Sequence, residues 1–170
     1  MARHTDPVLV DTMTILDTHK DGTWGALSGG YSVETVEDCV METQTGFQRR
    51  KPEENIDPVQ LRKELKAVHN VSDLERANVL LNSDGIALDL GEQSLWAHAL
   101  TRKDAWVLCG PDKASLRFGV HMKCRDRMIS LERLLTEVGR NPKRLDEKHT
   151  TKWLNRVLGE FVLEESMKKL

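Results

Sequence analysis

The stretch Pro7-Val8-Leu9-Val10-Asp11 carries the pattern that decides the fold, a short apolar run that ends in a carboxylate. Such a run is typical of a strand buried on both faces of a parallel sheet. The stretch Ala105-Trp106-Val107-Leu108-Cys109 has the same character, and Gly110-Pro111 ends it just before Asp112. An acid at the end of a buried strand is costly without a partner, so Asp11 in particular is a candidate site residue.

Helical patterns lie between and after these two strands. We expect helices over 12–19, 33–41, 59–69, 72–81, 92–101, 113–120, 130–138 and 150–167. Turns are expected around Trp24 and Leu27, and a loop over 47–57. Strands that alternate with helices predict an α/β fold with an open parallel sheet covered on both faces. In such sheets the site lies beyond the carboxyl ends of the strands.

Length and composition predict one domain over 1–170, with 128–170 as a helix-rich C-terminal extension. Hydrophobic residues make up 39% and charged residues 31%, as in an ordinary globular protein. No apolar run approaches the ~20 residues of a membrane span, and the first residues contain no signal-peptide core. Three scattered cysteines favour neither a zinc site nor a disulfide framework. We therefore expect a cytoplasmic protein without a membrane partner.

The net charge of −2 gives no global basic field that would indicate a nucleic-acid binder. Basic residues nevertheless cluster in two places, at 49–51 and between 113 and 127. Clusters of this kind are as often solvated surface as binding sites, so charge alone decides nothing.

Four carboxylates occupy defined places in this pattern: Asp11, Glu42, Glu92 and Asp112. Hard divalent cations such as Mg²⁺ take oxygen ligands, and an additional acid could orient or deprotonate an attacking water. Each acid also has an ordinary explanation. Glu92 would suit the dipole of a helix that starts after Gly91, and Asp112 taken alone is better explained as a helix N-cap. The four acids together, more than any one of them, indicate a metal site.

Three segments then resemble a known family, the PIN domains. Segment 8–16, Val-Leu-Val-Asp-Thr-Met-Thr-Ile-Leu, resembles the opening strand and first acid of that family. Segment 89–100 resembles its Gly-Glu helix, and segment 106–115 resembles the strand and loop that bear its last acid. Segment 38–42 matches the second acid less closely. The resemblance covers about 7–120 and implies a three-layer α/β/α sandwich with a central parallel sheet.

The resemblance implies a metal-dependent endoribonuclease, with the toxin of a toxin–antitoxin pair as one form of it. By the same resemblance Asp11, Glu92 and Asp112 would hold Mg²⁺ or Mn²⁺, and Glu42 would orient water or serve as an outer ligand. RNA would be the substrate and an antitoxin an inhibiting protein partner, while the amphipathic C-terminal helix is compatible with a homodimer. Four basic residues are candidates for phosphate contacts: Arg49, Arg50, Lys113 and Arg117.

The sequence also departs from the family's pattern. Met13 replaces an asparagine that is frequent two residues after the first acid, and Pro111 stands where many relatives have another acid. Cys109 stands where a threonine or serine is frequent. The loss of an acid at Pro111 favours the main alternative, a catalytically degenerate PIN-like module that binds RNA or protein, whereas the four acids in sequence order oppose it. An aspartyl phosphotransferase is disfavoured, because that class needs an acid at position 13.

Overall fold

The centre of the molecule is a four-stranded parallel sheet in the order β3-β2-β1-β4. The structure, a computed structural model, describes residues 4–46 and 50–170. Its strands are β1 (Val8–Val10), β2 (Val33–Val36), β3 (Ala67–His69) and β4 (Val107–Cys109). The register places Val10 beside Cys109, so β1 and β4 end at the same level.

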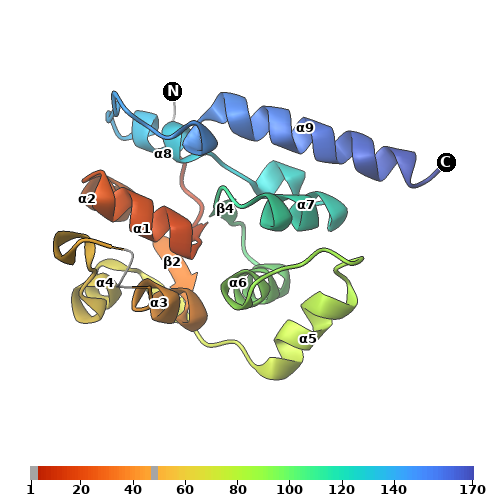
Figure 1. Ribbon diagram of the computed structural model, residues 1–170, viewed down its shortest axis with the longest axis horizontal. Coiled ribbons are helices and arrows are strands. Elements are labelled where there is room, and N and C mark those ends of the chain that lie inside the picture. Colours follow the sequence, from red (N-terminus) through yellow and green to blue (C-terminus); the bar gives the residue numbers. More distant parts are fainter. Residues whose placement is uncertain (1–3, 47–49) are drawn as a thin grey trace.

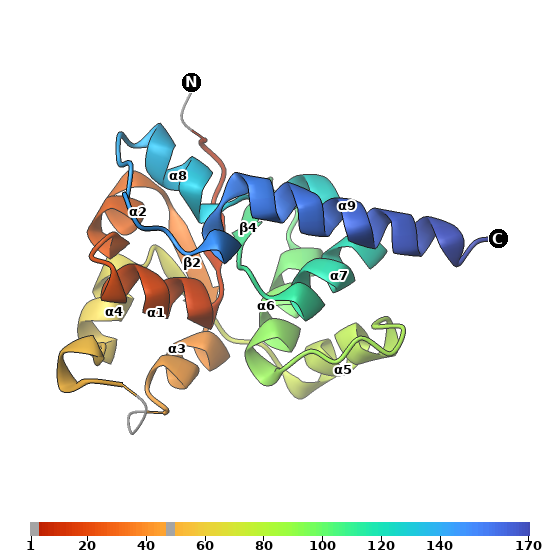
Figure 2. The ribbon, with the colours of Figure 1, turned by 45° about the horizontal axis from the view of Figure 1, so that its top comes forward.

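Helices surround the sheet in both ribbon views (Figures 1 and 2). Within the described residues, the helices that precede β3 are α1 (Thr12–Lys20), α2 (Trp24–Gly30), α3 (Glu37–Thr43) and α4 (Pro58–Glu64). Those that follow it are α5 (Asp73–Leu81), α6 (Leu90–Thr101), α7 (Lys113–His121), α8 (Leu131–Glu137) and α9 (Thr151–Met167). Short 3₁₀ turns occur at η2 (Pro52–Glu54), η3 (Arg125–Arg127) and η4 (Glu147–His149).

The sheet has a hydrophobic core on each face, which agrees with the expected α/β fold. Side chains alternate along a strand, so Leu9 faces one core while Val8 and Val10 face the other. The Leu9 core is closed mainly by α5, α6, α7 and α9, and the opposite core mainly by α1, α2, α4 and α8. In Figure 1 these two groups of helices lie largely to the right and to the left of the strands. The arrangement is consistent with a three-layer α/β/α sandwich.

The strand order creates a switch point between β1 and β4. The chain moves outward from β1 to β2 and β3, and then returns through α5 and α6 to the other side of β1. Helices that leave adjacent strands in opposite directions open a crevice at the carboxyl ends of those strands, which is where ligands bind in open α/β sheets. Asp11 follows β1 at this point, and Asp112 follows β4 across it.

The C-terminal segment packs onto this frame. Met128 forms a parallel bridge with Leu108, and the Ile129 amide donates to the Leu108 carbonyl at 3.0 Å. Farther along, Trp153 and Phe161 on α9 enter the core that contains Leu9. In Figure 2 the segment between α8 and α9 passes close to α1.

Two of the expected helices are wrong. The chain over 33–41 first forms β2 and only then α3, and the chain over 59–69 ends its helix at Glu64 before forming β3. The strand β2 does not have an apolar sequence, because it contains the polar residues Glu34 and Thr35. These side chains are buried in the fold, where they form hydrogen bonds with partners distant in the sequence. The region of expected turns around Trp24 is α2.

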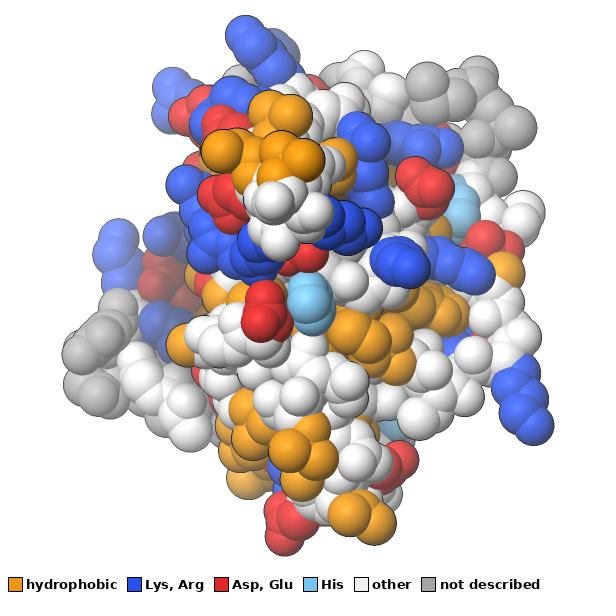
Figure 3. Space-filling model, turned by 90° about the vertical axis from the view of Figure 1, so that its right-hand side faces the viewer, with side chains coloured by type: hydrophobic (Ala, Val, Ile, Leu, Met, Phe, Trp, Pro, Cys, Tyr) orange, Lys and Arg blue, Asp and Glu red, His pale blue; other side chains and the backbone are white. Residues whose placement is uncertain are grey.

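Figure 3 shows one side of the surface. Lys and Arg side chains are most numerous in its upper half, and apolar side chains occur near the top, at the centre and in the lower half. Three leucines of α5 are exposed, namely Leu74, Leu80 and Leu81. Among the described residues, no helix combines the length and apolar character that a membrane crossing requires.

Candidate active site

A cavity of about 350 Å³ opens at the switch point of the sheet. All four carboxylates singled out in the sequence line it, although they come from four different parts of the chain. Its lining consists of Asp11, Thr12, Met13, Leu16, Asp17, Cys39, Glu42, Asp89, Glu92, Asp112 and Lys148. The fold thus gathers these acids beyond the carboxyl ends of β1 and β4.

Asp11 is the most enclosed of the acids, with 7% of its surface exposed. It is the N-cap of α1, where its Oδ1 accepts a hydrogen bond from the Thr14 amide at 2.8 Å. Burial raises the pKa of Asp11 to about 6, although the hydrogen bonds from Thr14 act in the opposite direction. The loop after β4 leaves room for this carboxylate only because residue 110 is glycine, since a Cβ there would lie 2.7 Å from Asp11 Oδ2.

Glu42 reaches the cavity from the end of α3 and is held by two donors. The Thr12 hydroxyl donates to Glu42 Oε2 at 2.7 Å, and the Gly91 amide donates to Oε1 at 3.0 Å. A Cβ on residue 91 would lie 2.8 Å from both carboxylate oxygens, so this approach requires glycine. The pKa of Glu42 is raised, chiefly by burial. The side chain is therefore positioned by its neighbours and remains able to take a proton.

Glu92 and Asp112 form a coupled pair across the cavity. Glu92 is buried, with 8% of its surface exposed, and it forms a capping box with Asp89 at the start of α6. The Glu92 amide donates to the Asp89 side chain at 2.8 Å, and the Asp89 amide donates to the Glu92 side chain at 3.0 Å. Burial, followed by the hydrogen bond and charge of Asp112, raises the pKa of Glu92. Asp112 caps α7 by accepting from the amides of Ala114 and Ser115. Asp112 is thus the helix N-cap that its sequence position alone favoured, and it is also part of the cavity wall.

The electrostatics of the cavity suit a hard divalent cation. Asp11, Asp89 and Asp112 cap α1, α6 and α7, so three helix N-termini face the same space and partly offset the negative charge. Burial is the first cause of the raised pKa values of Asp11, Glu42 and Glu92, and the neighbouring carboxylates add to it. Buried carboxylate oxygens are the ligands that Mg²⁺ and Mn²⁺ prefer, so the donor set fits the expected ion.

The ligand atoms of the cavity acids are spaced more widely than in a compact group of three ligands. Two other groups of described residues bring three ligand atoms within 4.8 Å of one another, namely Glu34-His69-His98 and Asp84-His121-Glu165. The acids of the cavity are not among these groups of described residues. Mg²⁺ usually takes only one or two protein carboxylates and keeps several waters, so a compact three-ligand group is not required to hold it.

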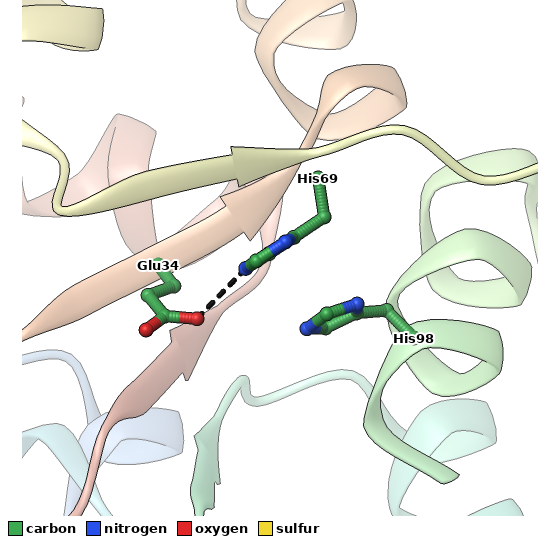
Figure 4. Close-up of side chains that lie close together, drawn as sticks. All are labelled: Glu34, His69 and His98. Carbon is green, nitrogen blue, oxygen red and sulfur yellow. Dashed lines mark hydrogen bonds and ion pairs between the residues drawn. The ribbon is translucent and has the colours of Figure 1, made fainter. Parts of the chain in front are cut away.

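The Glu34-His69-His98 group is better explained as a structural network. Figure 4 shows Glu34 bonded to His69 and His98 stacked beside it. The two imidazole rings lie 3.7 Å apart at 15°, and an ion in the plane of one ring would lie outside the plane of the other. Arg102 donates to Glu34 and lies 3.1 Å from His98 Nε2, which must therefore accept. Burial, together with the charges of His69 and Arg102, lowers the pKa of His98 to about 4 and keeps it neutral.

The candidate phosphate contacts lie elsewhere. Arg49 is outside the described residues, and Arg50 donates to the carbonyls of Thr43 and Thr45 at the end of α3. Lys113 is an exposed residue in the first turn of α7 and does not line the cavity. Arg117 faces α9, where it pairs with Glu164 at 3.2 Å and lies over the Phe161 ring. None of the described members of this set contributes to the cavity wall.

Of the lining residues with a hydroxyl or a charged group, four were missed in the sequence: Thr12, Asp17, Asp89 and Lys148. Asp89 could have been found from the sequence as the N-cap that faces Glu92, because the two residues have the spacing of a capping box. Asp17 and Lys148 have no local signal, since their contact joins α1 to the segment before α9.

Comparisons of the chain with protein-family models, with curated proteins and with solved structures found no match.

Proposed function

We propose that this chain is a metal-dependent endoribonuclease of the PIN-domain-like class. One observation carries the proposal: Asp11, Glu42, Glu92 and Asp112, which resemble the acids of that family in sequence order, line a single cavity at the switch point of a parallel sheet. The donor set fits Mg²⁺ or Mn²⁺, and the place fits a ligand site in an open α/β sheet.

In this proposal Asp11, Glu92 and Asp112 hold the divalent cation. A cation bound there supplies positive charge to the phosphodiester and lowers the pKa of water. Glu42 orients the attacking water and takes its proton, a role for which a raised pKa is favourable. Thr12 and Gly91 keep the Glu42 carboxylate pointed into the cavity while this occurs.

The test is cleavage of labelled single-stranded and structured RNA with Mg²⁺, Mn²⁺ or EDTA. Wild type is compared with Asp11→Asn and Asp112→Asn. Asp104→Asn is the matched control, because Asp104 precedes β4 at the opposite end of the sheet and its side chain is 54% exposed. We expect metal-dependent cutting that Asp104→Asn retains and both cavity variants lose. Cutting that persists in EDTA or in Asp11→Asn would contradict the proposal.

A second function, RNA or protein binding without cutting, is favoured by one observation. Burial and the neighbouring Asp112 raise the pKa of Glu92, so this carboxyl can be held neutral by a proton and does not by itself require a cation. This function predicts that Mn²⁺ does not change the melting temperature and that no RNA is cut. The antitoxin, the homodimer and the cytoplasmic location remain predictions.

A further inference from the structure

One cation faces the acids of the cavity. Of the described residues that line it, six are Asp or Glu and Lys148 is the only Lys or Arg. Lys148 belongs to η4, in the part of the chain that follows the PIN-like resemblance. A lysine at the wall of an acidic cavity is either a charge partner for the acids or a contact for an anionic ligand.

The contacts of Lys148 separate these two roles. Its Nζ lies 3.0 Å from Asp17 Oδ2 and 3.8 Å from Asp146 Oδ2, both of which lie outside the proposed metal and water ligands. Within the described chain, no ion pair joins it to Asp11, Glu42, Glu92 or Asp112. Its side chain is 30% exposed, so the ammonium group retains access to solvent. Lys148 is therefore held in the cavity wall by Asp17 and is not paired with the four acids proposed as metal and water ligands.

Its neighbours fix this position. His149 is 3% exposed, and its Nε2 lies 2.7 Å from the same Asp17 Oδ2 that contacts Lys148. The Asp146 side chain also accepts from the Lys148 amide at 3.2 Å and begins η4. Although burial opposes it, hydrogen bonds from His149 and Lys148 lower the pKa of Asp17 and keep this carboxylate charged. One carboxylate on α1 thus anchors two consecutive residues of η4.

We propose that Lys148 contacts a phosphate of an RNA strand bound in the cavity, and that Asp17 and His149 are positioning residues that hold its ammonium group there. This inference rests on the proposed function, because it assigns the phosphate contact to the same site. A lysine binds phosphate as a point charge with three donors, so it needs a fixed place more than a fixed orientation. The cavity thereby combines carboxylates that hold a metal ion with one lysine that contacts the RNA.

The first experiment measures binding of a labelled single-stranded RNA with Ca²⁺ present, over a series of KCl concentrations. Lys148→Ala should weaken binding roughly tenfold, as expected for one charge-assisted contact that is partly exposed to solvent. It should also reduce the slope of log K against log salt by about 0.7, the value for one phosphate on a single strand. Lys148→Arg retains the charge and should retain the slope. Lys152→Ala removes the same charge from an exposed position on α9 and should change neither quantity.

The second experiment measures cleavage kinetics with Mg²⁺. Because the contact is made to bound RNA before and during the reaction, Lys148→Ala should raise KM while kcat changes less than about threefold. Asp17→Asn should weaken RNA binding in wild type and have no further effect in Lys148→Ala, since a positioning residue acts only through the residue it positions. Circular dichroism of each variant separates these effects from loss of folding.

Each outcome decides one of the two proposals. If Lys148→Ala matches Lys152→Ala in affinity and in salt slope, or if wild type does not bind the RNA, Lys148 is not the phosphate contact. Additive effects of Asp17→Asn and Lys148→Ala would overturn the positioning role. If wild type binds RNA with a slope that depends on Lys148 but never cuts it, the phosphate contact stands and the nuclease proposal fails.

Discussion

Replacement of Asp11 by asparagine should stabilise the metal-free protein. Asparagine has nearly the same shape, and its carbonyl oxygen can still accept from the Thr14 amide, but it carries no charge into the buried position. The pKa of Asp11 is raised from 3.8 to about 6, chiefly by burial. A shift of about two pKa units corresponds to about 3 kcal/mol between the charged and the protonated side chain.

The sign of the effect follows from proton linkage. A carboxyl with a raised pKa favours the folded state fully below the unfolded pKa, and this contribution is lost as the pH rises through the folded pKa. Wild type therefore loses stability relative to Asp11→Asn between pH 4 and pH 7. The two pKa values give an advantage for the variant of about 2 kcal/mol at pH 5 and about 3 kcal/mol at pH 8.

The assay is urea denaturation of both proteins in EDTA at a series of pH values. Asp104→Asn serves again as control and should show no such gain with pH, because this exposed acid has a lowered pKa set by Arg102. Equal stability of wild type and Asp11→Asn at pH 8 would refute the argument that a buried charge at this position is costly. Saturating Mn²⁺ should remove the advantage of the variant, because only the wild-type carboxylate gains an ion partner.

Three further predictions concern the cavity and the sheet. Gly91→Ala should reduce RNA cleavage at least tenfold, because the added Cβ would lie 2.8 Å from the Glu42 carboxylate oxygens and would push that carboxylate out of place. A loss smaller than twofold in the RNA assay would count against this constraint. Mn²⁺ affinity measured by calorimetry should rise from pH 6 to pH 8, because the raised pKa of the cavity acids means that protons must leave as the ion binds; a flat profile would contradict this. Glu34→Ala should cost about 3 kcal/mol, because it removes a buried carboxylate that contacts both Arg102 and His69 and leaves the exposed Asp104 as the remaining acid partner of Arg102. Glu37→Ala at an exposed pair should cost about 1 kcal/mol or less in the same denaturation experiment.

The sequence was sufficient where local pattern and burial agree. The apolar runs at 8–10 and 107–109 were correctly predicted as the strands β1 and β4. Ser72 and Thr150 correctly indicated the starts of α5 and α9. The strand β2 was missed because its polar side chains are satisfied by distant partners, such as the Val10 carbonyl that accepts from Thr35 at 2.7 Å. β3 is short and only half-buried, so its sequence continues the helical pattern of α4.

The same distinction applies to the candidate site. Acids at the boundaries of strands and helices could be proposed from the sequence, because those boundaries converge at one edge of a parallel sheet. The pairing of Asp17 with Lys148 could not, because neither residue has a partner near it in the sequence that would reveal the contact. Tertiary structure alone brings η4 to α1.

The bond between Asp17 and His149 also bears on the order of folding. It joins residues separated by 132 positions, so closing that loop carries a high entropic cost and is expected late. During synthesis from the N-terminus, all four proposed catalytic acids leave the ribosome before the segment that bears Lys148 and His149. A partly made chain therefore has its acids but lacks one wall of the cavity. On the proposed function, the growing chain would lack the phosphate contact of Lys148 and would bind RNA more weakly until its C-terminal segment has folded.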